Sequence, residues 1–379
     1  MLTTVFSVTV FFFPLQTFTS EVCRLGKRQS PIEIKSSEAR YQSFPPLKLV
    51  GHDSLSLKAG TLYAKNANGS TVKLYSNTQG FKTNNVAVLT GGPLNTVYEF
   101  AEMHFHWGEY ENFTYHGSEH SFEGSTYPLG LHLVHKNIND DTVEEAITHE
   151  NGLAVLEFNF RITSDGIPEK DRKASRNEGL EHLAQIVKDH LTEPNSQFEA
   201  KDLKGKKLDV NVMNFVPIVL DEYFHYKGSL TTGTCDQAVN WIVFRNPLAI
   251  ASNDYFYALK TIKGLDGKVV KKNFRPIQKT NGRPVYYHGE DLINAKVIKK
   301  GKNSMGAFGT GPPEHNYWLL PHCPGSPTPA PLWEVKRQRA DKKVWESRPC
   351  KNGEGKGNNG EEKEKKEKVL VNDYMISLL

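Results

Sequence analysis

His104, His106 and His132 are the residues whose types and spacing first indicate chemistry. The first two stand two apart in an apolar run, so on a β-strand both rings would point to the same face of a sheet. His132 lies in a second strand-like run, residues 131–134, and its ring completes the cluster if the two strands pair antiparallel. Three imidazoles leave one position of a tetrahedral zinc ion open for water, as in catalytic rather than structural zinc sites.

A lone H-x-H pair is more often a packed or surface feature than a metal site, so the surrounding motifs decide the interpretation. Seven short segments resemble the hallmark segments of the α-class carbonic anhydrases, in the family's order and with near-family spacing from about Cys23 to Tyr287. They are QSPI at 29–32, GGPL at 91–94, HFHWG at 104–108, SEH at 118–120, LHLVH at 131–135, SLTT at 229–232 and NFRP at 273–276.

The resemblance implies a mainly β fold with few helices (α+β), built on a central, twisted, mostly antiparallel ten-stranded sheet. It implies zinc held by the three histidines and reversible hydration of carbon dioxide to bicarbonate and a proton. By the family's pattern Thr231 donates a hydrogen bond to an ionised Glu119 and orients the attacking water, and the amide of Thr232 faces a substrate oxygen.

A small apolar substrate needs an apolar wall beside the metal. The residues that match the family's wall are Val134, Val155, Leu230, Val239 and Trp241. Without the resemblance, plain core packing would be the preferred interpretation of each.

Departures from the family's pattern affect catalysis. Ser70 aligns with the histidine that relays the product proton to solvent, and a serine cannot do so near neutral pH, which predicts a lower, buffer-dependent rate. Gly130 replaces the glutamate that accepts the remaining N–H of the third ligand, and losing such a partner typically weakens metal affinity or activity ten- to a hundredfold. Water or a backbone carbonyl could substitute for it. Glu102 stands where the family has a glutamine and can still orient His104.

The elements that position these residues follow from periodicity. Apolar or alternating runs predict strands at residues 72–75, 86–90, 98–107, 129–135, 153–160, 239–245 and 255–260. A three- and four-residue repeat of apolar side chains predicts one surface helix at 179–191.

Composition indicates an ordinary globular chain: of 379 residues, 38% are hydrophobic and 24% charged. The net charge of +4 gives no case for a nucleic-acid or membrane-surface partner. Residues 1–20 resemble a secretory signal peptide, because a Phe-rich apolar run at residues 2–15 is followed by small polar residues. The alternative is a membrane anchor, but the run is shorter than the roughly 18 residues that span a bilayer. We therefore expect a secreted, extracellular protein, with the catalytic domain at 21–290 and an extension at 291–379.

Four cysteines behind such a leader favour disulfides. The resemblance places one bridge between Cys23 and Cys235, whereas a pairing of Cys323 with Cys350 stays open. Asn68 and Asn112 begin N-x-[ST] sequons, the acceptor sites of an exported glycoprotein.

Residues 351–368 are a Gly, Asn, Glu and Lys mixture, for which a solvated, disordered tail is the plainer interpretation. The sharper one is a mineral or matrix contact, because secreted carbonic anhydrases of calcifying invertebrates carry similar low-complexity segments. A role in biomineral formation is the matching expectation. The rival function is a catalytically weak matrix or binding protein with a carbonic-anhydrase-like domain; silent relatives usually lack a ligand histidine, and this chain keeps all three.

Overall fold

The computed structural model describes residues 20–77, 86–111, 114–162, 177–217, 219–250 and 253–289. The chain divides into two units, Met1–His315 and Asn316–Leu379, and only the first contains described residues. The expected leader up to residue 19, Asn112, the extension from residue 291 and Cys323 and Cys350 lie outside them.

One large mixed sheet of thirteen strands dominates the described residues. Its strands are β2 (Arg40–Tyr41), β3 (Lys48–Val50), β4 (Leu62–Ala67), β5 (Thr71–Ser76), β6 (Val88–Thr90), β7 (Tyr98–Trp107), β11 (Leu129–Asn137), β12 (Leu153–Ile162), β13 (Gln197–Phe198), β14 (Tyr223–Gly228), β15 (Val239–Phe244), β16 (Leu248–Ile250) and β17 (Tyr286–His288). Two small sheets pair β1 (Glu33–Ile34) with β10 (Ser121–Phe122), and β8 (Tyr110–Glu111) with β9 (Thr114–Tyr115).

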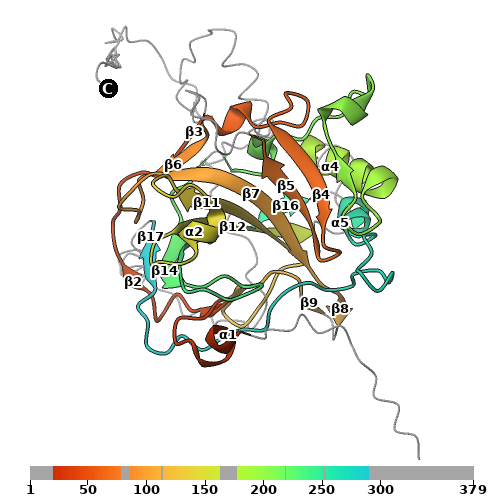
Figure 1. Ribbon diagram of the computed structural model, residues 1–379. Helices are drawn as coiled ribbons and strands as arrows, with labels where there is room; N and C mark the ends of the chain where they lie inside the picture. Colours follow the sequence, from red (N-terminus) through yellow and green to blue (C-terminus); the bar gives the residue numbers. More distant parts are fainter. Residues whose placement is uncertain are drawn as a thin grey trace, which may run out of the picture. The chain divides into compact units, whose positions relative to one another are not determined.

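Ten of the thirteen strands follow one path, in the order β13-β4-β5-β7-β11-β12-β15-β14-β17-β2. Most neighbours are antiparallel; the parallel pairs of this sheet are β12 with β15, β12 with β16, and β17 with β2. Figure 1 shows β7, β11 and β12 as long, curved ribbons running side by side through the sheet. The expected mainly β, mostly antiparallel fold is confirmed, with the short strands β3, β6 and β16 added beside the ten-stranded path.

The helices within the described ranges are short apart from one. They are α1 (Glu21–Leu25), α2 (Val143–Ala146), α4 (Glu178–His190) and α5 (Asn253–Leu259), with 3-10 turns η1 (His52–Ser54), η2 (Ala200–Leu203) and η3 (Val212–Asn214). The helix predicted at 179–191 is α4, which begins where the Asn177 side chain accepts the backbone N–H of Leu180. α4 packs against α5, and the two lie together in Figure 1.

The strand predicted at 255–260 is wrong, because residues 255–259 lie in α5 and residue 260 is in the turn that follows. Phe256 and Leu259 stand three apart and are both buried in the core, whereas Tyr257 is half exposed. That spacing suits one face of a helix. A short aromatic run has little periodicity of its own, so packing against α4 decides its conformation.

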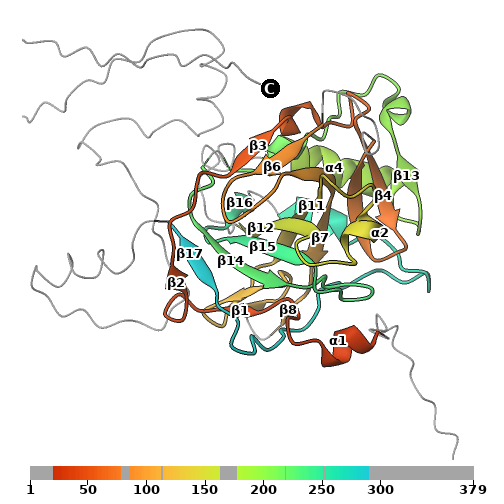
Figure 2. The same ribbon diagram turned by 60° about the vertical axis from the view of Figure 1, so that its left-hand side comes forward.

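Strand alternation divides the interior into two hydrophobic clusters. On β12, Ala154, Leu156 and Phe158 belong to the larger cluster, which also contains the apolar face of α4. Leu153 and Val155 point the other way, into a smaller cluster on the opposite face of the sheet. The second face is the one that carries the histidines, and Figure 2 shows α2 and the strands around it from another side.

A disulfide joins Cys23 of α1 to Cys235, across 212 residues of sequence. This is the pairing that the family resemblance implied, and it is confirmed. The bridge ties the segment that enters the domain to the turn after residues 231–232. No helix among the described residues has the length and apolar character required to cross a membrane.

Candidate metal centre

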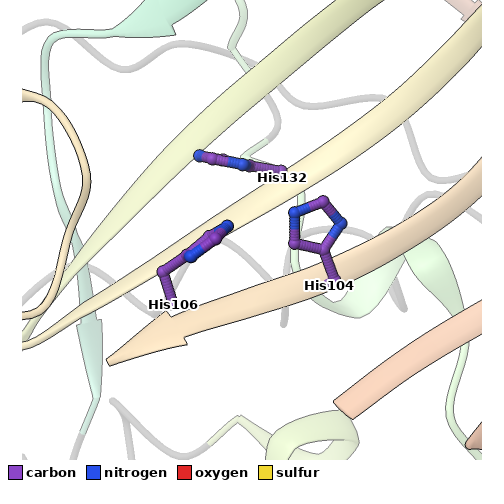
Figure 3. A group of neighbouring side chains, drawn as sticks. All are labelled: His104, His106 and His132. Carbon is purple, nitrogen blue, oxygen red and sulfur yellow. The ribbon is translucent and has the colours of Figure 1, made fainter. Parts of the chain in front are cut away.

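The three predicted histidines converge from two neighbouring strands. β7 and β11 pair antiparallel with His132 directly opposite His104, and His106 follows two residues along β7 on the same face. One ring nitrogen from each histidine lies within 4.8 Å of the others. Figure 3 shows the three rings directed toward a common space in front of the sheet.

Hydrogen bonds at the outer nitrogens decide which nitrogen of His104 and His106 faces that space. Nδ1 of His104 lies 2.9 and 3.0 Å from the two carboxylate oxygens of Glu102. Nδ1 of His106 lies 2.9 Å from the carbonyl oxygen of Asn273. Both rings are therefore left with Nε2 toward the centre, and Nε2 of His106 is buried without a hydrogen-bond partner among the described residues.

His132 has the opposite arrangement. Its Nε2 lies 3.0 Å from Oε2 of Glu157, on the adjacent strand β12, which leaves Nδ1 toward the centre. The sequence predicted that Gly130 deprives His132 of a carboxylate partner, and this expectation is wrong. Glu157 stands opposite His132 in the β11–β12 register, so the carboxylate comes from across the sheet rather than from two residues earlier on the same strand.

Burial and the neighbouring carboxylates set the charges of the unliganded cluster. Burial lowers the pKa of His104 to about 3, although Glu102 opposes it, and burial also lowers the pKa of His106. For His132, burial acts downward, but the charge and hydrogen bond of Glu157 outweigh it and raise the pKa. Burial would raise the pKa of Glu102, yet His104 and Lys73 hold it at about 2.

The donor set fits zinc. Three imidazole nitrogens facing one point, each ring held through its other nitrogen, are the ligands and the outer partners typical of zinc centres with an open position. The buried, unpartnered Nε2 of His106 is the observation in favour, because a buried polar atom normally has a partner and a cation would supply one. His104, His106 and His132 would hold the ion.

Glu119 lies behind the cluster and is held from one side. Its Oε1 accepts the backbone N–H of Arg275 at 2.8 Å, and its Oε2 lies 3.5 Å from Nε2 of His106 and 3.9 Å from Nδ1 of His132. Oε2 has no hydrogen-bond partner in the described part of the chain, so the bond from Thr231 that the family's pattern implies is not made here. Glu119 is oriented by Arg275 alone, with its second oxygen directed at the imidazoles.

A cavity of about 600 Å³ opens in front of the histidines. Its lining includes His104, His132 and, of the expected site residues, Glu102, Val134, Val155, Leu230, Thr231, Thr232 and Trp241. Trp241 donates its indole N–H to the carbonyl of Ser229, which fixes the ring beside the loop that carries Thr231 and Thr232. An apolar wall and a set of polar groups thus meet at the cluster.

Two of the expected residues lie elsewhere. Val239 is buried in the smaller hydrophobic cluster, to which Trp241 also belongs, and is not part of the lining. Ser70 follows the turn after β4, donates its hydroxyl to the carbonyl of Ala67 at 2.6 Å, and does not line the cavity either. Asn68, the first residue of the sequon, is exposed in the same turn.

Among the described residues the only histidines that line the cavity belong to the cluster.

Sequence reasoning missed the parts played by Glu157, Asn273, Arg275 and Lys73. Glu157 had a recognisable signal, because it is a charged residue inside the apolar strand run at 153–160 and has the parity of the cavity residue Val155. Asn273 and Arg275 belong to a recognised motif whose contacts only the structure supplies. Lys73, whose Nζ lies 3.3 Å from Oε1 of Glu102, is the one Lys or Arg in the cavity lining within the described ranges.

Comparisons with known proteins agree with this geometry. The model of the eukaryotic-type carbonic anhydrase family matches residues 17–289. Carbonic anhydrase 7 of Mus musculus is 34% identical over 265 residues, covering 69% of this chain and 88% of the relative. The mitochondrial carbonic anhydrase 5A of Rattus norvegicus is 29% identical, covering 69% and 76%. A carbonic anhydrase-related protein of Homo sapiens is 30% identical, covering 69% and 83%.

Proposed function

Because the chain belongs to the eukaryotic-type carbonic anhydrase family, we propose that it interconverts carbon dioxide and bicarbonate, with zinc held by His104, His106 and His132. The observation that carries the proposal is the convergence of three buried or nearly buried imidazoles on one point at the floor of a cavity with an apolar wall. When bound, zinc supplies the Lewis acidity that makes water nucleophilic near neutral pH.

The chain's own residues supply orientation and a place for the substrate. Val134, Val155, Leu230 and Trp241 provide apolar surface suited to carbon dioxide. Glu119 is an acceptor whose free oxygen faces the centre, and Thr231 is the hydroxyl of the cavity that would donate to it. The N–H of Thr232 is available to an oxygen of the substrate or product.

The leaving proton has to pass from the cavity to solvent. Since the cavity histidines of the described chain are all zinc ligands, we infer that buffer molecules accept the proton directly. The turnover rate is then limited by buffer concentration rather than by the chemical step.

We also propose that the protein acts outside the cell. The Cys23–Cys235 disulfide supports this, because such bonds persist in oxidising compartments. The exposed position of Asn68 is compatible with glycosylation. Contact with a matrix or mineral, and a supply of carbonate for biomineral formation, rest only on the composition of residues 351–368. Measuring how much of the full chain and of a chain ending at residue 290 binds to calcium carbonate would test this contact.

Metal content measured beside the hydration rate on one preparation tests the enzymatic proposal. We expect about one zinc per chain and stopped-flow hydration that a chelator abolishes and zinc restores. His106→Asn should lose both properties, whereas His149→Asn, at an exposed histidine paired with Asp140, should keep both. Full zinc occupancy with a hydration rate equal to that of buffer would overturn the proposal in favour of a binding or matrix protein.

A further inference from the structure

Glu157 is buried on the same face as the metal cluster and belongs to none of the segments by which the family is recognised. We propose that Glu157 is the positioning residue of the third ligand: a carboxylate supplied from the neighbouring strand that fixes His132 with Nδ1 toward the metal, in place of the side chain missing at Gly130. The inference rests on the proposed function in taking zinc as the resident ion.

The chain contains an internal reference for this interaction. His104 is oriented by Glu102, two residues earlier on the same strand and therefore on the same face. The equivalent position for His132 is Gly130, which offers no side chain. Glu157 is the residue directly opposite His132 on β12, and side chains opposite each other in an antiparallel pair share a face and lie in contact. The same interaction is thus made along one strand for His104 and across two strands for His132.

The surroundings of Gly130 explain why the carboxylate does not come from there. A Cβ at Gly130 would lie 3.3 Å from Cα of Ser118 and 3.4 Å from Oδ1 of Asn159, so a longer side chain would need its neighbours to shift. Asn159 is the residue opposite Gly130 on β12. The two strands therefore place a small residue opposite Asn159 and a carboxylate opposite His132.

A chain of hydrogen bonds holds Glu157 in turn. Its Oε2 accepts from Nδ1 of the buried His120 as well as from His132. Nε2 of His120 lies 2.6 Å from the hydroxyl of Tyr226, which lies 2.7 Å from Oγ of Ser30. Ser30 also accepts the backbone N–H of Ser229, and when Ser30 donates its own proton to Tyr226, Tyr226 donates to His120. This direction leaves Nδ1–H of His120 for Glu157 and fixes the carboxylate from behind.

A purely structural role would not favour a glutamate at this position. Glu157 is 0% exposed, although the residues that flank it on β12, Leu156 and Phe158, face the core on the other side of the sheet. A fully buried carboxylate gives up its hydration, and an apolar residue of similar size is often as stable or more stable. What an apolar residue cannot do is accept Nε2–H of His132 and thereby select the nitrogen that faces the metal.

Zinc affinity of the full chain tests the proposal. We expect Glu157→Gln to raise the zinc dissociation constant, measured by competition with a chelator, about 10- to 100-fold. Glu99→Gln is the matched control: Glu99 is also a buried carboxylate, bound to Nζ of Lys136 at 2.8 Å, but it contacts no residue of the cluster. Glu99→Gln should change thermal stability but leave the zinc dissociation constant within about threefold of the wild-type value.

The ring of His132 gives a second readout that does not depend on activity. In the zinc-loaded wild type, we expect the ¹⁵N spectrum of His132 to show a protonated Nε2 and a metal-bound Nδ1, and Glu157→Gln to shift the Nε2–H resonance upfield. A Glu157→Gln protein that binds zinc as tightly as Glu99→Gln, with an unchanged Nε2–H resonance, would overturn the proposal.

A relocated carboxylate provides the converse test. Glu157→Gly should weaken zinc binding. Adding Gly130→Glu to this variant should tighten zinc binding again by about tenfold. Glu102 and His104 show that a carboxylate two residues earlier on the strand can reach the ring. If the double variant does not fold, the two readouts on Glu157→Gln still decide. Tight zinc binding without hydration activity in the wild type would overturn the proposed function alone, because affinity and ring protonation can still be compared.

Discussion

Nε2 of His52 lies 3.0 Å from Nε2 of His135, and both rings are buried against Phe100. The pair joins η1 to β11 on the far side of the strand from the metal cluster. Nδ1 of His52 faces the carbonyl of Val50 at 3.3 Å, and Nδ1 of His135 faces that of Leu133 at 3.2 Å. One Nε2 must donate its proton to the other, so when both rings are neutral only the accepting ring keeps an Nδ1 proton for its carbonyl.

This histidine pair should make stability depend on pH. Burial lowers the pKa of His52 from 6.5 to about 4, with Asp53 opposing it, and burial and His52 lower the pKa of His135. The unfolded chain binds protons near pH 6.5 while the folded chain resists them, so the free energy of unfolding is largest above pH 6.5. It falls as the pH drops toward 4, by up to about 1.4 kcal/mol per pH unit for each histidine.

Denaturant unfolding of zinc-loaded protein between pH 7 and pH 4.5 checks this expectation. His52→Leu should flatten the pH dependence in that window by about one proton. His149→Gln is the control of opposite sign, since its exposed ring has a pKa raised by the hydrogen bond to Asp140, which contributes stability at low pH that is lost as the pH rises. Parallel stability curves for wild type and His52→Leu would contradict the prediction.

Glu119→Gln should lower the turnover number without removing zinc. The amide can still accept the N–H of Arg275 at Oε1, but it presents a donor where the carboxylate presents a free acceptor. We expect a loss of about 10²-fold in the hydration rate, measured by stopped flow, which is the usual cost of misplacing an oriented reactant. Thr231→Val should cost a similar factor, and the double variant little more, if the two residues act through one hydrogen bond. Additive losses would show that they act separately.

Buffer should control the rate of the wild type. Because the proton has no non-ligand histidine to leave by within the described cavity, raising the concentration of an imidazole buffer should raise the turnover number about tenfold before it saturates. Ser70→His should reduce this dependence if a ring at the turn after β4 reaches the cavity water. Ser36→His, at another surface position, is the matched control. A buffer-independent wild type would argue against proton transfer as the limiting step. Identical buffer dependence in all three proteins would show that a ring at residue 70 does not relay the proton.

Removing the disulfide should destabilise the domain. Cys23→Ser with Cys235→Ser frees a loop of 212 residues, and such a loss typically costs about 2–5 kcal/mol. Calorimetry should therefore show a lower melting temperature, and reduced wild type should match the double variant. The turnover number should fall too, because the bridge anchors the turn that follows Thr231 and Thr232. Equal melting temperatures for the oxidised wild type and the double variant would refute the expectation.

Much of the site could be predicted from sequence. The alternation of a β-strand places His104 and His106 on one face wherever that strand lies, and the ordered motifs identify Glu119, Thr231 and the Cys23–Cys235 pair through the family. The apolar repeat of α4 is equally local. Tyr98–Trp107 and Leu129–Asn137 begin where the sequence predicted, because long strands with clear flanking turns carry their own signal.

Other features depend on which strands become neighbours. Glu157 lies 25 residues from His132 and meets it only because β11 and β12 pair in one register, which local periodicity does not specify. The same is true of His52 and His135, and of Arg275 beside Glu119. The aromatic run of α5 becomes a helix because α4 offers it a surface. Sequence determined which side chains could bind a metal; the pairing of distant strands decided which carboxylate orients each one.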